Sequence, residues 1–360
     1  MRLSHSSVSC FQECAKKYHY RYVEKLFPKT THAALLFGSA LDKAVEILLQ
    51  TSSYDKAKIK FIEMWNRQEI NKVPESLQEN TKIVYANSDF DWDLLSKEDA
   101  DFLSTYTKDD IVAAYNSAST QKDAIGYDLL KKELKVFFNV ANWLCLKNKG
   151  LLMLESFDKY IMPNIEKVFA TQVPIELMNT DGDNIIGYAD FVVKWKNEEN
   201  PIIFDLKTSS REYDKDSVLS SPQLTLYTHT LGETYKTRKA GFIVLNKHIR
   251  KNKTKVCSVC GFDGSGQRHK TCSNEVEGKR CGGEWIETIK PEVYIQVLIN
   301  DISDRLEEIM LENYNMINDS IKSGIFPRSF TSCKQGYGLC PYYDVCYKNN
   351  CDKMIKMEDK

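Results

Sequence analysis

The chain has 360 residues, of which 42% are hydrophobic and 28% charged, with 16 Gly and 9 Pro. This composition excludes a disordered or collagen-like chain, and the length suits one domain with insertions or two linked domains. The formal net charge of -1 argues against a protein that coats nucleic acid by bulk electrostatics, so any such contact must be local. No apolar run approaches the roughly 18 to 20 residues of a membrane span, and the start has no apolar signal core, so we expect a cytoplasmic protein with no membrane partner. In that compartment the eleven cysteines favour metal ligation over disulfides.

The N-terminal part of the chain is predicted to be helical. Apolar residues that recur three or four apart predict an amphipathic helix over residues 6 to 26, with Cys10 and Cys14 on one face. A second helix is expected to begin near Gly38, and it places Asp42 beside its apolar stripe.

Residues 55 to 170 are also helix-like, and Gly126 and Gly150 are the expected breaks. The pattern then changes to short β-branched runs bounded by turn residues, which predicts strands at Val173–Leu177 and Ile185–Trp195. We therefore expect a helical arm followed by a sheet.

The second of these strands is predicted to continue into a hairpin. A polar turn over residues 196 to 200 separates it from a strand over residues 201 to 207. The other predicted elements are a helix from Pro222 to Gly232, a strand over residues 240 to 246, and a long helix that begins at Pro291 and ends before Gly324.

The predicted hairpin places acidic and basic side chains together. With a period of two, Asp205 and Lys207 share one face of their strand, and Asp190 lies opposite the apolar face of its own strand. A turn centred between residues 197 and 198 sets Asp190 directly across from Asp205. Two carboxylates about 5 Å apart repel each other unless a cation lies between them, and a divalent ion with Lys207 supplies that charge. These oxygen ligands suit Mg²⁺ or Mn²⁺, which can clamp a phosphate and activate a water molecule.

Several motifs extend this interpretation along the chain. In order, they are LSHSSVSCFQECAKKYHYRY, FGSALDKAVE, GYADFVV, IIFDLKTSS, QLTLY and a cysteine-rich tail. This set resembles the PD-(D/E)XK nuclease superfamily, and within it the RecB-like branch, which includes the nuclease domains of RecB and AddB and the CRISPR-associated RecB-type exonucleases. The resemblance implies an α/β fold of the restriction-endonuclease type, in which helices flank a mixed sheet. To this core we expect a helical arm and a small zinc-ribbon insertion to be added.

The domain boundaries are predicted from these elements. The N-terminal helices of the core occupy residues 1–50, the helical arm 51–170, the catalytic core 171–250, the zinc ribbon 251–288, and the C-terminal helix with the cysteine tail 289–360.

The resemblance also implies roles for particular residues. Asp190 and Asp205 would ligate the metal, with the backbone carbonyl of Leu206 helping. Lys207 would orient or activate the attacking water and stabilise charge on the phosphate.

Two further family positions lie on helices. Gln223 and Tyr227, four residues apart on one helix face, match the family's Q-xxx-Y helix, which supports the site and the DNA strand. Many relatives carry His four residues after the helix-opening Gly, but here Gly38 is followed at that place by Asp42. An aspartate can still ligate a hard metal ion, so Asp42 is either a metal ligand or a solvated helix residue.

Four cysteines match the one-plus-three arrangement with which RecB-like relatives hold a 4Fe-4S cluster. They are Cys14, Cys333, Cys340 and Cys346. Four thiolates ligate such a cluster, and joining both ends of the chain would close a very long loop. Zinc is the alternative metal for four thiolates, and Cys10 or Cys351 is an alternative ligand.

A second cysteine group lies in the predicted insertion. It consists of Cys257, Cys260, Cys272 and Cys281, and the Cys-x2-Cys-Gly and Cys-Gly-Gly turns predict a zinc ribbon. The second pair is spaced more widely than usual, so His269 is a possible replacement ligand. Such a module is too small to fold without its metal, and it either serves the structure alone or grips nucleic acid beside the basic run Lys247–Lys255.

The function implied by the resemblance is metal-dependent hydrolysis of DNA by an exonuclease that acts on single-stranded ends. Recombination, repair or phage DNA processing would be the setting, with a helicase or recombination protein as partner. Two alternatives are open: a catalytically inactive DNA-binding scaffold, motivated by Asp42, and a zinc-ribbon adaptor that docks onto a replication or transcription complex.

Overall fold

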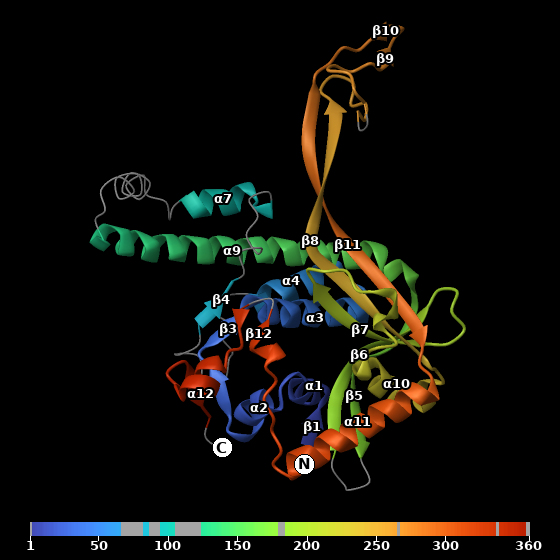
Figure 1. Cartoon of the computed structure of the whole chain (residues 1–360). Coiled ribbons are helices and arrows are strands. Elements are labelled where there is room, and N and C mark those ends of the chain that lie inside the picture. The colour runs from blue at the N-terminus through green and yellow to red at the C-terminus, as the bar shows by residue number, and fades with distance from the viewer. Residues whose placement is uncertain are drawn as a thin grey trace.

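A central mixed β-sheet with helices on both faces organises the computed structural model of this chain (Figure 1). The structure describes residues 2–65, 82–85, 94–104, 124–178, 184–264, 267–335 and 338–357. The predicted fold class is thereby confirmed as α/β, with a mixed sheet flanked by helices. Among the described helices, none combines the length and apolar character needed to cross a bilayer.

The sheet has six strands, ordered β1-β6-β7-β8-β11, with β5 on the other edge of β6. Only the β1–β6 and β7–β8 pairs are parallel. The strands are β1 (Arg2–Ser4), β5 (Ile165–Met178), β6 (Asn184–Trp195), β7 (Ile202–Ser209), β8 (Lys239–Cys257) and β11 (Trp285–Asp301).

Strand β6 creates a fork in this sheet. One edge of β6 pairs with β5 along the strand, while the other edge pairs with β1 over residues 184–186 and with β7 only over residues 191–193. The ladder between β6 and β7 places Phe191 opposite Phe204, which is the register that the sequence predicted for the hairpin. Beyond that pair the two strands separate, so residues 187–190 face a gap bordered by β1 and β7. We call this gap the fork.

One hydrophobic core lies between the sheet and three helices. These are α3 (Ala33–Thr51), α4 (Tyr54–Trp65) and α9 (Ala124–Tyr160). Helix α3 begins at Ala33, before the start that was predicted near Gly38. The predicted break at Gly150 was wrong, because α9 continues through this residue. A Cβ at Gly150 would lie 2.0 Å from the ring of buried Phe61, so this glycine allows the two helices to approach closely.

The second core covers the opposite face of the sheet. Its helices are α1 (His5–Glu13), α10 (Pro222–Tyr235) and α11 (Asp304–Lys322). The predicted helix start at Pro291 was wrong, because residues 285–301 form a strand and Ser303 caps α11 instead. Val293, Ile295, Val297 and Ile299 alternate through this stretch, and that period of two lets it pair with β8.

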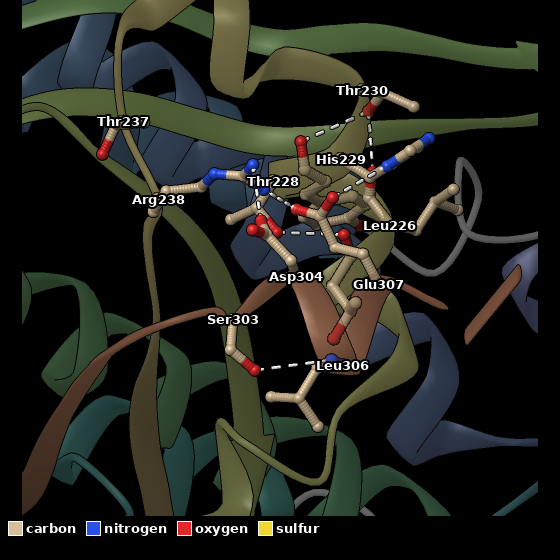
Figure 2. Close-up of polar contacts among 12 residues, drawn as sticks. Leu226, Thr228, His229, Thr230, Thr237, Arg238, Ser303, Asp304, Leu306 and Glu307 are labelled. Atoms are coloured by element: carbon tan, nitrogen blue, oxygen red, sulfur yellow. Dashed lines mark hydrogen bonds and ion pairs between the residues drawn. The ribbon is translucent and has the colours of Figure 1, made fainter. Parts of the chain in front are cut away.

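A polar network fixes the start of α11 against α10 and β8 (Figure 2). Glu307, 8% exposed, accepts from Arg238 and lies 3.0 Å from Nδ1 of His229, and Arg238 also pairs with Asp304 at 2.8 Å. Because a buried carboxylate is costly without partners, this network holds the second core together at one end of the sheet.

Strands β8 and β11 continue beyond the sheet as a two-stranded arm that stands away from the body of the molecule (Figure 1). The ladder is irregular at the base of the arm, where Ile249 pairs with Val293 but Leu245 pairs with Ile295. Asn246 lies in this irregularity and accepts from the backbone N–H of His248 at 2.8 Å. The tip carries the cysteine-rich insertion and the short strands β9 (Glu275–Val276) and β10 (Lys279–Arg280).

The first predicted helix is interrupted at Cys14, whose backbone is extended (φ -164°, ψ 111°). The chain resumes as α2 (Ala15–Tyr18) and a π-helical turn over His19–Val23. The C-terminal tail packs against this region, and Tyr342 donates to the carbonyl oxygen of Leu26 at 2.8 Å. The remaining short elements are β2 (Leu26–Pro28), β3 (Thr30–His32), β4 (Lys82–Val84), α7 (Lys97–Ser104), β12 (Lys334–Gln335), β13 (Gly338–Leu339), α12 (Tyr343–Lys348) and β14 (Met354–Lys356).

Candidate active site and cysteine centres

Three carboxylates converge on the fork from three different elements. Asp190 comes from β6, Asp205 from β7 and Asp42 from α3. Asp190 Oδ2 accepts a 2.7 Å hydrogen bond from the backbone N–H of Leu206, at the place where the ladder between β6 and β7 has ended. The side chain of Asp190 thus takes over the bond that a strand carbonyl would make, which fixes this carboxylate beside β7.

Burial raises the pKa values of all three carboxyl groups, and repulsion by neighbouring carboxylates adds to the shift at Asp42 and Asp190. Burial, then Asp205, raises the pKa of Asp42 to about 7. Burial, Asp205 and Asp42 raise the pKa of Asp190 well above its usual value. Asp205 is 1% exposed, and burial raises its pKa although Lys207 opposes the shift. Burial is the largest cause of each shift, so the three carboxyl groups can ionise together only if further positive charge lies beside them.

Lys207 is the cation of this group. Its Nζ lies 2.7 Å from Asp205 Oδ2 and donates to Gln223 Oε1 at 3.1 Å. Asp205 Oδ2 is buried, and among the described residues Lys207 is its ion-pair partner and no other group donates a hydrogen bond to it. The two nearby aspartates outweigh the effect of burial and raise the pKa of Lys207, so the ammonium stays protonated.

Helix α10 contributes the Gln223 and Tyr227 pair to the site. Gln223 Nε2 donates to the Tyr227 hydroxyl at 2.6 Å, and that hydroxyl donates to the carbonyl oxygen of Tyr188 at 2.8 Å and lies 3.4 Å from Asp205 Oδ1. The pair therefore links Lys207, Asp205 and the unpaired edge of β6. Ser221 caps this helix and Pro222 begins it, which fixes where Gln223 stands.

Three side chains near the fork were not predicted from the sequence. His5 follows β1 directly, and burial, with a smaller effect of Lys207, lowers its pKa to about 4. The charges of Lys207 and Asp205 also reach Tyr213. Tyr188 is 61% exposed two residues before Asp190. Of the three, only Tyr188 could have been found from the sequence, because it stands two residues before Asp190 in the GYAD motif. His5 and Tyr213 reach the fork from distant parts of the chain.

The donor set at the fork fits a hard divalent cation. It offers buried carboxylate oxygens from Asp42, Asp190 and Asp205, the hard ligands that such an ion prefers. These oxygens do not all lie within 4.8 Å of one another, so the set is looser than a closed metal site.

The arm tip brings four thiols into one compact group. Among the described His, Cys, Asp and Glu side chains, this is the only group of three or more whose ligand atoms all lie within 4.8 Å of one another. Its members are Cys257, Cys260, Cys272 and Cys281. The Sγ atoms of Cys257 and Cys281 are 3.5 Å apart, and those of Cys260 and Cys272 are 3.7 Å apart. Zn–S bonds of about 2.3 Å in a tetrahedron require sulfur atoms about 3.8 Å apart, so this group, which we call the knuckle, fits a zinc ion.

Backbone geometry prepares the knuckle for a metal. Backbone hydrogen bonds, the largest from Cys260, lower the pKa of Cys257 to about 6. A Cβ at Gly283 would lie 2.7 Å from Cys257 Sγ, so only glycine leaves room for the sulfur there. His269 is not part of the group; its carbonyl oxygen accepts from Trp285 Nε1 at 2.9 Å.

The four terminal cysteines line one cavity between α2 and the C-terminal tail. They are Cys14, Cys333, Cys340 and Cys346. Neither alternative ligand lines this cavity, since Cys10 is buried in the second core and Cys351 is exposed. The extended backbone at Cys14 is the reason that Cys10 and Cys14, predicted to share a face, point to different surroundings.

These terminal thiols are spaced more widely than those of the knuckle, because they form no group within 4.8 Å. Arg328 Nε donates to Cys346 Sγ at 3.1 Å, and the N–H of Ser329 donates to Cys14 Sγ at 3.5 Å. Donors to sulfur stabilise thiolates, and the wider spacing suits a multi-atom cluster better than one zinc ion.

Comparison with known proteins gave one family match. The sequence profile of the PD-(D/E)XK nuclease superfamily matches residues 2–347. Among solved structures, the chain is similar to the crystal structure of SSO0001, with 15% sequence identity, coverage of 71% of this chain and 95% of that chain, and a TM-score of 0.29. No curated protein matches the chain.

Proposed function

The chain belongs to the PD-(D/E)XK nuclease superfamily, and from this premise we propose that it is a metal-dependent DNA exonuclease that acts on single-stranded ends. The setting that we propose is recombination, repair or phage DNA processing, beside a helicase or recombination protein. The observation that carries the proposal is the fork, where the side chains of Asp190, Asp205 and Lys207 meet in a largely buried site.

Asp42, Asp190 and Asp205, with the backbone carbonyl of Leu206, would hold a Mg²⁺ or Mn²⁺ ion. When bound, the ion supplies Lewis-acid stabilisation of the charge that develops on the scissile phosphate. Asp42 stands where many relatives have His, and its position beside Asp205 supports its role as an oxygen ligand.

The remaining chemistry is assigned to side chains of the chain itself. Lys207, held by Gln223, keeps its proton, so it orients the attacking water and stabilises phosphate charge without abstracting a proton. Tyr227 holds Asp205 in place and anchors the carbonyl of Tyr188. His5 is neutral above pH about 4, so it adds no second positive charge beside Lys207.

The preference for single strands rests on the RecB-like resemblance and on Tyr188. This tyrosine is exposed and its backbone carbonyl is held by Tyr227, so its ring offers an exposed aromatic surface two residues before Asp190. Stacking of an unpaired base on an aromatic ring contributes about 1 to 3 kcal/mol. A base that is paired inside a duplex is not available for this contact.

We assign a 4Fe-4S cluster to the terminal cysteines and zinc to the knuckle. The cluster would act as a clasp, since Cys14 and Cys333 are joined only through most of the chain. Anaerobically purified protein should be brown and contain about four iron atoms and one zinc atom per chain. A colourless protein with two zinc ions per chain would remove the cluster and leave the nuclease proposal standing.

The nuclease proposal is tested by cleavage of end-labelled single-stranded DNA with Mg²⁺ or Mn²⁺. The Asp205→Asn variant should lose at least about 10³-fold of the rate, because it removes a metal ligand at the reacting centre. Asp319→Asn, which changes an exposed carboxylate on α11, is the matched control and should cleave like the wild type.

Two outcomes would replace the nuclease proposal. DNA binding without cleavage, unchanged in Asp205→Asn, would favour the inactive scaffold. Absence of DNA affinity together with salt-insensitive binding to a protein partner would favour the zinc-ribbon adaptor.

A further inference from the structure

The arm begins beside the fork. Strand β8 pairs with β7 up to Ser209 opposite Asn246, and Lys207 of the fork is opposite Val244 in the same ladder. Just beyond that ladder, Lys247 Nζ lies 5.5 Å from the ring centroid of Phe37, on the helix that carries Asp42. A strand of nucleic acid that leaves the fork on the α3 side therefore meets the base of the arm first.

The arm is basic within a slightly acidic chain. Residues 247–292 contain ten Lys and Arg and six Asp and Glu, a net charge of +4, whereas the whole chain has -1. The rest of the chain therefore has a net charge of -5. This separation of charge favours an anionic ligand along the arm and disfavours it on the other surfaces.

Lysines recur on one face of the arm. Ile249, Lys251 and Lys255 alternate onto the same face of β8, and Ile249 is buried in the core formed with α3. Lys251 is exposed, and Lys255 lies 5.3 Å from the ring centroid of Trp285 and donates to the carbonyl oxygen of Gln267 in the knuckle. The basic face thus begins on the α3 side of the sheet and follows the twist of the two-stranded arm toward the tip.

The knuckle extends this basic face. Arg268, Lys270 and Lys279 are exposed there. Trp285 fixes the knuckle to the end of the ladder, because its indole donates to His269 and fills the space beside Gly264. The exposed cations are therefore carried on a part of the chain whose position relative to β8 and β11 is set.

We propose that the arm is a second nucleic-acid site, which binds the phosphate backbone of the DNA strand whose end lies in the fork. This inference rests on the proposed nuclease function and adds a substrate requirement to it. The nine ladder pairs from Ile249 to Cys257 are separated by eight steps of roughly 3.3 Å, which span about 26 Å, the rise of about eight stacked nucleotides. Oligonucleotides shorter than this reach the fork but not the tip.

The test compares the wild type with a triple variant, Lys251→Gln, Arg268→Gln and Lys270→Gln, on single strands of 6 and 24 nucleotides. The matched control removes three exposed cations elsewhere: Lys236→Gln, Arg305→Gln and Lys348→Gln. Binding is measured at several salt concentrations without added magnesium, and cleavage with magnesium. No chelator is added, so that metal stays in the knuckle.

The arm variant should bind the 24-mer on the order of 10- to 100-fold more weakly, with a salt slope smaller by about 2, while its rate on the 6-mer is unchanged. The control should match the wild type on both. Equal binding of the 24-mer by the arm variant and the control would overturn the proposal. Preferential binding of polyglutamate, lost in the arm variant, would also overturn it, in favour of an acidic protein partner.

This design separates the arm from the nuclease proposal. If no protein cleaves either oligonucleotide but the arm variant alone loses affinity and salt slope, the nuclease function fails and the nucleic-acid site on the arm stands. If all proteins cleave both lengths at equal rates with equal affinity, the arm proposal fails and the nuclease function stands.

Discussion

The fork and the knuckle are two candidate metal sites that depend on their ions in opposite ways. The fork lies between two hydrophobic cores, and Asp205 on β7 is flanked by buried Phe204 and Leu206. Around the knuckle, over residues 257–285, the described residues that are buried are all cysteines or glycines. None of these buried residues has an apolar side chain that could form a core. An ion at the fork therefore changes chemistry on a fold that already exists, whereas an ion at the knuckle supplies the fold itself.

The two sites also differ in the pKa values of their candidate ligands. At the fork, burial holds the carboxyl pKa values up and one lysine is the nearby cation. At the knuckle, backbone hydrogen bonds lower the pKa values of Cys257 and Cys260, whereas burial raises the pKa of Cys272. Protons therefore compete with a metal ion for the carboxyls of the fork up to a higher pH than for ordinary carboxyls, while two thiols of the knuckle lose their protons more readily than ordinary thiols.

The largest expected effect is that of Lys207→Met on activity. The variant should lose at least about 10³-fold in rate, because it removes charge stabilisation at the phosphate. It should also lower the melting temperature of the metal-free protein, since Asp205 then lies buried without its cation. Manganese should restore that stability without restoring the rate, as measured by thermal unfolding and cleavage in parallel.

Gln223→Ala is the companion variant to Lys207→Met, because it frees the ammonium without removing it. It should lose less activity and keep the metal-free stability closer to that of the wild type. If manganese restored the rate of Lys207→Met, the lysine would have only a structural role and the contrast between chemistry and fold would fail at the fork.

Loss of the knuckle metal should unfold the arm tip alone. A chelator, or Cys260→Ser, should expose the backbone amides of residues 257–285 to hydrogen exchange, since no apolar core holds them. Exchange in β7 should stay at the wild-type level. Mass spectrometry of peptic peptides measures both regions at once, and protection of the tip that survives removal of the metal would contradict the contrast.

Magnesium affinity should depend on pH through Asp42. Its folded pKa of about 7 lies above the ordinary value of 3.8, so the carboxyl is mostly protonated below pH 7 and cannot ligate. Between pH 6 and pH 8 the deprotonated fraction rises about 10-fold, and the magnesium dissociation constant should fall by about the same factor. Titration calorimetry measures this dependence.

The Asp42→Asn variant distinguishes Asp42 from its neighbours. It should bind magnesium more weakly and with less dependence on pH in this range. The same pH dependence in Asp42→Asn and in the wild type would show that Asp42 is a solvated helix residue and not a ligand.

The parts of the fold that follow from local patterns were predicted from the sequence. The alternation in β6 and β7 fixed the hairpin register, because the period of two is a property of neighbouring residues. The two-stranded arm of β8 and β11 was not predicted from the sequence. The part of β8 from Lys247 onward is polar and has no alternation of apolar residues beyond Ile249. Pro291, which is typical of a helix start, is tolerated in β11 because both strands of a two-stranded arm have an open edge.

Features that depend on distant contacts could not be predicted. The break at Cys14 accompanies its approach to the C-terminal tail, where Ser329 donates to its sulfur. His5 and Asp42 come to the fork from opposite sides of the sheet, through α1 and α3. Sequence spacing carries no information on such approaches, so Asp42 became a candidate only through the family resemblance and His5 was not predicted.

The smallest expected effect tests whether the cores alone support the fork. Gly150→Ala should destabilise the protein by about 1 to 3 kcal/mol, because the new Cβ would lie 2.0 Å from the buried ring of Phe61. Gly38→Ala is the matched control on α3, where the nearest atom to a new Cβ is Thr208 Oγ1 at 3.7 Å, so a gain of about 0.5 to 1 kcal/mol from helix propensity is expected. Chemical denaturation measures both. Gly150 lies in the contact between α4 and α9, and none of the three carboxylates of the fork belongs to either helix. Gly150→Ala should therefore lower stability while its magnesium affinity stays at the wild-type value, and a parallel loss of affinity would show that the fork and its cores are not separable.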